Sequence, residues 1–132
     1  MSYSCIEAES RYLATMWTVA RLGLPEGFAG PVTYSLYVDE IMDSAEYEEI
    51  FVLDSEGRKV AYFSWCVSND IHHKGDILDV TNVVINPDED SLALRKFLAK
   101  RFKTLAELND CTWVSRCVHE DDGSIRNIFK RV

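Results

Sequence analysis

Three absences narrow what this sequence of 132 residues can do. It has no long hydrophobic run, so no segment is predicted to span a membrane. Its first five residues lack the basic and apolar regions of a secretory leader, and we therefore expect a cytoplasmic protein. The four cysteines form no CxxC pair: Cys5, Cys66, Cys111 and Cys117. This spacing favours free thiols in a reducing compartment and predicts no zinc site.

Positive charge is also scarce. The chain has 14 Lys and Arg against 22 Asp and Glu, which gives a net charge of −8. Residues 1–66 account for −7 of it and residues 67–132 for −1. Because contacts to phosphates dominate non-specific nucleic-acid binding, we expect no nucleic-acid partner. An acidic surface either keeps the protein soluble or attracts basic partners, and the sequence leaves both open.

Linkers, repeats and low-complexity tracts are missing as well, and 47% of the residues are hydrophobic. We therefore predict a single domain over residues 1–132. Helical spacing of apolar residues predicts one helix from Glu9 to Leu22, ended by Gly23 and Pro25. A second helix is predicted after Pro31, with Thr33 as its N-cap.

The pattern then changes to strands. Three antiparallel strands are predicted at residues 49–54, 60–67 and 76–85, and the middle strand is apolar enough to be covered on both faces. A helix at 90–108 and a strand at 112–118 follow, which predicts a parallel crossover. A terminal hairpin through residues 124–132 completes the prediction. The fold class is therefore α+β, with three layers and a mixed, mostly antiparallel sheet.

The junction Asn82-Val83-Val84-Ile85-Asn86-Pro87 places a strand, a proline and then a helix in direct succession. This order resembles the central motif of the Gcn5-related N-acetyltransferases (the GNAT family), whose loop wraps the pyrophosphate of acetyl-CoA. Aligned on Pro87, the chain has Asp90 in place of the family's Gln or Arg. Ala93 replaces the first glycine, and Arg95 replaces the last small residue. We expect Asp88, Glu89 and Asp90 to lie in the first turn of the helix and to repel an anionic ligand.

The resemblance implies roles for a few residues. The family often has a carboxylate base on its fourth strand, a position that Asp79 fills here, where a raised pKa would suit it for removing a proton. The family's cofactor would lie against the strand backbone and the nearby basic residues: Val83, Val84, Ile85, Arg95 and Lys96. Many members use a tyrosine on a fourth helix to protonate the leaving thiolate, but this chain has no tyrosine after Tyr62 and no predicted fourth helix. We expect no bound cofactor, and acetyl-CoA if the chain is active.

No metal site is predicted, because His72 and His73 have no further ligand at a useful spacing. The chain also resembles compact acidic GNAT-like proteins of short-tailed bacteriophages, through its size, its layout and its ending from Asp121 to Phe129. This resemblance implies a non-catalytic, protein-binding component of a virion or its assembly, located in the host cytoplasm or the virion. One alternative is an acyl-CoA-dependent N-acetyltransferase acting on a basic protein or small amine. The other is an acidic inhibitor of a host protein, using the cluster Glu40, Asp43, Glu46, Glu48 and Glu49.

Overall fold

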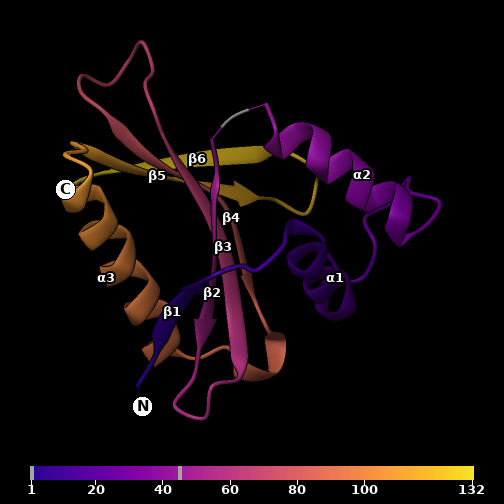
Figure 1. Cartoon of the computed structure of the whole chain (residues 1–132). Coiled ribbons are helices and arrows are strands. Elements are labelled where there is room, and N and C mark those ends of the chain that lie inside the picture. Colours follow the sequence, from indigo (N-terminus) through magenta and orange to yellow (C-terminus); the bar gives the residue numbers. More distant parts are fainter. Residues whose placement is uncertain (1, 45) are drawn as a thin grey trace. The chain divides into compact units, whose positions relative to one another are not determined.

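A six-stranded sheet is the framework of the chain, seen in a computed structural model that describes residues 2–44 and 46–132 (Figure 1). The strands follow the chain in the order β1-β2-β3-β4-β5-β6. They are β1 (Ser4–Glu7), β2 (Glu48–Leu53), β3 (Lys59–Ser68), β4 (Ile77–Ile85), β5 (Trp113–His119) and β6 (Ile125–Arg131). β1 and β2 pair antiparallel, β4 and β5 parallel, and β5 and β6 antiparallel. The mixed sheet, the parallel strand pair and the terminal hairpin are therefore confirmed.

In the described part of the chain, three α-helices and one short 3₁₀ turn accompany the sheet: α1 (Arg11–Leu22), α2 (Pro31–Met42), η1 (Pro87–Glu89) and α3 (Leu92–Leu108). The hydroxyl of Ser10 caps α1 by accepting the N–H of Leu13 at 3.1 Å. The prediction that Thr33 caps α2 was wrong, because the helix begins at Pro31 and Gly30 is its cap residue. Proline suits the first helical position, since its fixed φ is helical and its missing N–H would have no helical partner there. No helix among the described residues has the length and apolarity needed to cross a bilayer.

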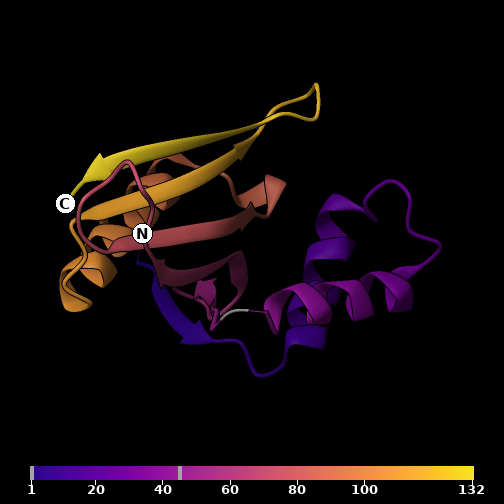
Figure 2. The ribbon, with the colours of Figure 1, turned by 90° about the horizontal axis from the view of Figure 1, so that it is seen from above.

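The chain divides into two compact units, which are described separately here. The N-terminal unit comprises Met1–Tyr62 and Val84–Asp90, and the C-terminal unit comprises Phe63–Val83 and Ser91–Val132. In the N-terminal unit, α1 and α2 lie side by side (Figures 1 and 2). Its core is formed by Ala14, Trp17, Phe51, Tyr62 and Val84. The ring of Trp17 meets that of Phe51 edge-on, with 5.4 Å between their centres.

The C-terminal unit packs α3 through one apolar stripe. Leu94, Leu98, Phe102 and Ala106 are the buried residues of this helix. The rings of Phe102 and Phe63 meet edge-on at 5.0 Å, which joins α3 to β3. β5 and β6 form a two-stranded ribbon that turns at residues 120–124 (Figure 2). Residues 60–64 of β3 are all buried, but Val67 is 44% exposed, so cover on both faces is confirmed only for the first part of the predicted strand.

The start of α3 differs from the prediction. Asp88 and Glu89 belong to η1, whose cap residue is Asn86, and no acidic residue lies in the first turn of α3. The hydroxyl of Ser91 caps α3 instead, by accepting the N–H of Leu94 at 3.1 Å. Pro87 explains the difference, because it starts a separate 3₁₀ turn, after which Asp90 and Ser91 are extended before α3 begins. The acids therefore precede the helix rather than neutralise its first turn.

Candidate functional site

Asp79, the predicted base, lies on β4 opposite Ser115 of β5 in the parallel register. Its side chain is half-buried, and the Ser115 hydroxyl donates a hydrogen bond to its Oδ1 at 3.0 Å. Ser115 itself is buried. The paired segment runs from Ile77 to Val80, so Asp79 lies inside it and not at an opening of the sheet. One lone pair of the carboxylate is thus already occupied by a neighbouring strand.

Alternation along the strands assigns the side chains of this unit to two faces. Val114 and Arg116 of β5 line a cavity together with Phe102 of α3, so they are on the α3 face. Asp79 and Ser115 are therefore on the opposite face. A ligand that reached both Asp79 and the basic residues of α3 would have to pass between β4 and β5.

The only route of that kind within this unit begins after Val80, as far as the structure describes the chain. Beyond Val80, no residue from Thr81 to Val83 pairs with β5 in the described register. β4 is held to β3 there: the hydroxyls of Thr81 and Ser64 are 2.8 Å apart, and Asn82 Nδ2 donates to Ser64 Oγ at 3.3 Å. Val83, a predicted cofactor contact, lies in this stretch and is half-buried. The arrangement leaves backbone of β4 without a β5 partner, as the binding of a pantetheine arm would require.

Val84 and Ile85, the next two predicted contacts, belong to the N-terminal unit. Val84 is buried in that unit's core beside Trp17 and Phe51. Just beyond Ile85, the N–H of Asn86 donates to the carbonyl of Val60 at 2.9 Å, which keeps the end of β4 against β3. The side chain of Val84 thus serves the core, and only its backbone remains for a ligand.

The two basic residues, Arg95 and Lys96, are exposed on the early part of α3. Arg95 lies close enough to Arg116 of β5 for its charge to act there. Burial lowers the pKa of Arg116, and the positive charge of Arg95 lowers it further. The Arg116 guanidinium lies 5.9 Å from the centre of the Phe102 ring. A cluster of like charges on an apolar floor is a setting that an anion would stabilise.

Cys117 is on the same face as Asp79 but does not provide a nucleophile. Burial raises the pKa of this thiol, and the carboxylate of Asp79 raises it further. Its Sγ donates a hydrogen bond to Oδ1 of Asn127 at 3.1 Å. The thiol therefore stays protonated at neutral pH, and thiolate chemistry is disfavoured.

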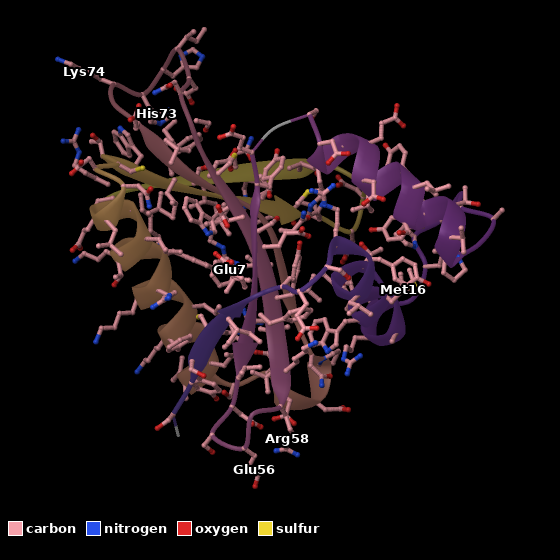
Figure 3. The ribbon with its side chains drawn as sticks, viewed as in Figure 1. Glu7, Met16, Glu56, Arg58, His73 and Lys74 are labelled. Atoms are coloured by element: carbon pink, nitrogen blue, oxygen red, sulfur yellow. The ribbon has the colours of Figure 1, made fainter. Side chains whose placement is uncertain are left out.

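The loop between β3 and β4 contains the two histidines. His73 Nδ1 lies 2.9 Å from Asp70 Oδ2, and its ring stacks on Phe129 with 3.9 Å between ring centres. Lys74, the next residue, points away from the protein (Figure 3). No group of three or more His, Cys, Asp or Glu in the described part of the chain could hold a metal ion. His73 thus makes local contacts that order the loop.

The acidic cluster of the N-terminal unit is partly neutralised from within. Arg11 Nη1 lies 2.7 Å from Asp43 Oδ1, and Arg11 Nε lies 3.3 Å from Glu49 Oε2. The Tyr62 hydroxyl also donates to Glu49 Oε1 at 2.7 Å. Glu49 is therefore committed to interactions inside its own unit. A row of acids that mimics phosphates would need these side chains to be exposed and unpaired.

Sequence reasoning did not identify Ser115 or Arg116. Ser115 was invisible because its role depends on the register between β4 and β5. Arg116 had a signal: in β5 and β6, basic and apolar residues recur at every second position, as in Arg126, Ile128 and Lys130. That alternation places them on one face of the hairpin.

Comparison with solved structures identifies the class of fold. The chain superposes on a GNAT family acetyltransferase from Staphylococcus aureus subsp. aureus USA300_TCH1516 with a TM-score of 0.67 and 12% identity, covering 100% of this chain and 98% of that chain. A putative acetyl transferase from Pyrococcus furiosus gives a TM-score of 0.67 at 13% identity, covering 91% of this chain and 85% of that one. At such low identity the likeness establishes the fold alone. The chain has the GNAT-like fold that the strand–proline–helix junction predicted.

The particular family follows from sequence. No family model matches the chain. Protein 7 of Escherichia phage T7 is 63% identical over 131 residues, covering 98% of both chains. The chain belongs to the family of this phage protein.

Proposed function

We propose that the chain is a phage-encoded GNAT-like protein that works by binding another protein rather than by transferring an acyl group, as a virion or assembly component. One observation carries the proposal. β5 ends at His119 and β6 begins at Ile125, with Glu120 N–H donating to the carbonyl of Ser124 at 2.9 Å across the turn. A tight hairpin thus occupies the place of the fourth helix that the family resemblance called for. No tyrosine follows Tyr62, so the described chain offers no such acid for a leaving thiolate.

The state of Asp79 supports the same conclusion. A general base must reach the proton that it removes, at hydrogen-bond distance or through one water. Asp79 is inside the paired part of β4 and β5 and already accepts the hydroxyl of Ser115. A carboxylate held in this way stabilises the pairing of β4 and β5 and is poorly placed to act as a general base.

A second candidate, an acyl-CoA-dependent N-acetyltransferase, is favoured by the start of α3. Its first turn has no acidic residue and is capped by Ser91. Arg95 and Lys96 follow on an exposed surface. Free N–H groups at a helix start, with cations nearby, are the usual setting for a pyrophosphate.

Calorimetric titration of the full chain with acetyl-CoA and with CoA tests the proposal. We expect no binding up to millimolar ligand. Micromolar binding that is lost in Arg95→Ala or Lys96→Ala, and kept in the matched control Lys100→Ala, would overturn the non-catalytic role. Lys100 is an exposed cation on the same helix, so it controls for net charge.

A further inference from the structure

The α3 face of the C-terminal hairpin contains a groove of about 250 Å³ between α3, β5 and β6. Its floor is apolar, from Phe102, Val114 and Ile128. Three cations on the same face surround the floor: Lys103, Arg116 and Lys130. Small-molecule sites commonly measure roughly 300–1,000 Å³. This groove is smaller, which suits one or two apolar side chains of a protein better than a whole cofactor.

Among the described residues, the cations of the groove have no acidic partner. The described ion pairs of this unit involve His73 and Arg126, and none involves Lys103, Arg116 or Lys130. Arg131 also borders the groove, but its guanidinium lies over the ring of Trp113 on the opposite face of the hairpin, 4.9 Å from the ring centre. The positive charge of Arg95 lies close enough to Arg116 to repel it. In a protein of net charge −8, this is a local excess of positive charge.

Helix α2 of the N-terminal unit presents the opposite chemistry. Four large apolar side chains on this helix are exposed: Val32 by 64%, Leu36 by 65%, Tyr37 by 49% and Ile41 by 45%. Glu40 lies among them on the exposed side and makes no ion pair in the described structure. The helix has no basic residue in its last turn, where its dipole would favour one. The apolar face of α2, with an acid near the negative end of the helix, is therefore complementary to an apolar surface that carries cations.

We propose that α2 of one copy of this chain docks into the α3–β5–β6 groove of a second copy. Apolar side chains of α2, with Leu36 at their centre, enter the groove, and Glu40 meets the cations at its rim. This is helix-in-groove recognition, with anchors spaced along one helix face. Because the two surfaces differ, the contact is head-to-tail, and repetition gives a ring or an open chain of copies.

The inference goes beyond the proposed function and is tested separately. Sedimentation velocity of the full chain should show a mean mass that rises from micromolar to submillimolar concentration and falls again when salt screens the charges. Leu36→Glu changes only the helix face, and Lys130→Glu changes only the groove. Each should weaken self-association about tenfold or more. The matched control Lys100→Glu makes the same charge change on exposed α3, outside the groove lining, and should associate as the unchanged chain does.

Mixing the two variants provides the decisive experiment. Leu36→Glu keeps an intact groove and Lys130→Glu keeps an intact α2, so the mixture should form one-to-one dimers and nothing larger. Recovery of association in the mixture also demonstrates that both variants are folded. An unchanged chain that stays monomeric, variants that associate normally, or a mixture that stays monomeric would each overturn the inference. Binding of CoA by a self-associating chain would instead overturn only the proposed function.

Discussion

The two units of the chain differ in charge more than the two halves of the sequence do. The N-terminal unit has fourteen Asp and Glu against four Lys and Arg, a net charge of −10. The C-terminal unit has eight against ten, a net charge of +2. The halves of the sequence conceal this contrast, because Asp88, Glu89 and Asp90 lie late in the chain but belong to the N-terminal unit. Charge in this protein is divided by structure, which gives one molecule two surfaces of opposite character.

The largest expected effects come from the cores, where the units should behave alike. Phe51→Ala in the N-terminal unit and Phe102→Ala in the C-terminal unit each remove a ring that is at most 3% exposed. Each should lower the free energy of unfolding by about 3–5 kcal/mol. Urea unfolding measures the loss, followed by the combined fluorescence of Trp17 in the N-terminal unit and of Trp65 and Trp113 in the C-terminal unit. Because β3 and β4 pass through both units, we expect one transition; two separate transitions would show that the units unfold independently.

A smaller effect should distinguish the acidic unit. Arg11→Ala removes the cation that holds Glu49, whose side chain is 13% exposed, and leaves that carboxylate with the Tyr62 hydroxyl. We expect a loss of about 1–3 kcal/mol in the free energy of unfolding. Chemical denaturation at neutral pH measures this loss. The free energy of unfolding of Arg11→Lys should fall between those of the unchanged chain and Arg11→Ala, because a single ammonium cannot reproduce the contacts to both Glu49 and Asp43. A loss equal to that of an exposed ion pair would mean that Glu49 is solvated.

One hairpin turn in each unit contains an aspartate that should make stability depend on pH, and the two turns can be compared in acid. The N–H groups of Arg58 and Glu56 and the Arg58 guanidinium hold the pKa of Asp54 below its usual value. In the other unit, the hydroxyl and N–H of Ser124 hold down the pKa of Asp122. A lowered folded-state pKa stabilises the protein above the unfolded value of about 4 and loses that effect as pH falls through the folded-state value.

The stability difference between the unchanged chain and Asp54→Asn should therefore be largest at neutral pH and shrink below about pH 4. Asp122→Asn should follow the same course with a smaller difference, because its turn is exposed whereas Asp54 is buried. Figure 3 shows Glu56 and Arg58 projecting together from the first of these turns. Thermal unfolding across pH measures both variants. A difference that grows in acid would contradict the assignment of these carboxylates.

The smallest effect is expected for the exposed pair of the C-terminal unit. Arg126 Nε lies 3.3 Å from Glu120 Oε1, and both side chains are largely in water, at 64% and 43% exposure. Arg126→Ala should change the free energy of unfolding by about 0–1 kcal/mol, since exposed ion pairs contribute little. Each of the two variants, Arg126→Ala and Arg11→Ala, removes one cation from an ion pair. The difference between their losses in the free energy of unfolding therefore reports the effect of burial. A loss as large as that of Arg11→Ala would contradict this difference between the units.

Local patterns predicted most of the fold because the responsible forces act over short stretches of chain. Apolar spacing predicted α1 and α3 to within two residues, and the continuous apolar run at residues 60–67 predicted β3, of which residues 60–64 are buried. The cap of α2 was missed because Pro31 starts that helix more readily than Thr33 caps it. The acids after Pro87 were misplaced because a separate 3₁₀ turn intervenes, and the sequence does not mark where such a turn yields to an α-helix.

The candidate site was less predictable, since it depends on contacts between distant residues. The position of Asp79 on its strand was readable, but its hydrogen bond to Ser115 follows from the register of a strand 36 residues later. The groove needs α3 and the hairpin together, and no local pattern brings Phe102 to Ile128. The alternation in β6 could have indicated a basic face, but not what that face surrounds.

The order of the strands adds a consequence for solubility. β6 is an outer strand of the sheet, and Arg126, Lys130 and Arg131 are three of its seven residues. An outer strand offers unpaired backbone groups on which other chains can grow fibrils, and rows of like charge oppose this because each added copy would stack cation on cation. The cations of β6, of which Lys130 also lines the groove, therefore oppose aggregation through this edge of the sheet. Replacing the cations of β6 with apolar residues should therefore leave a protein that is more prone to precipitate at high concentration.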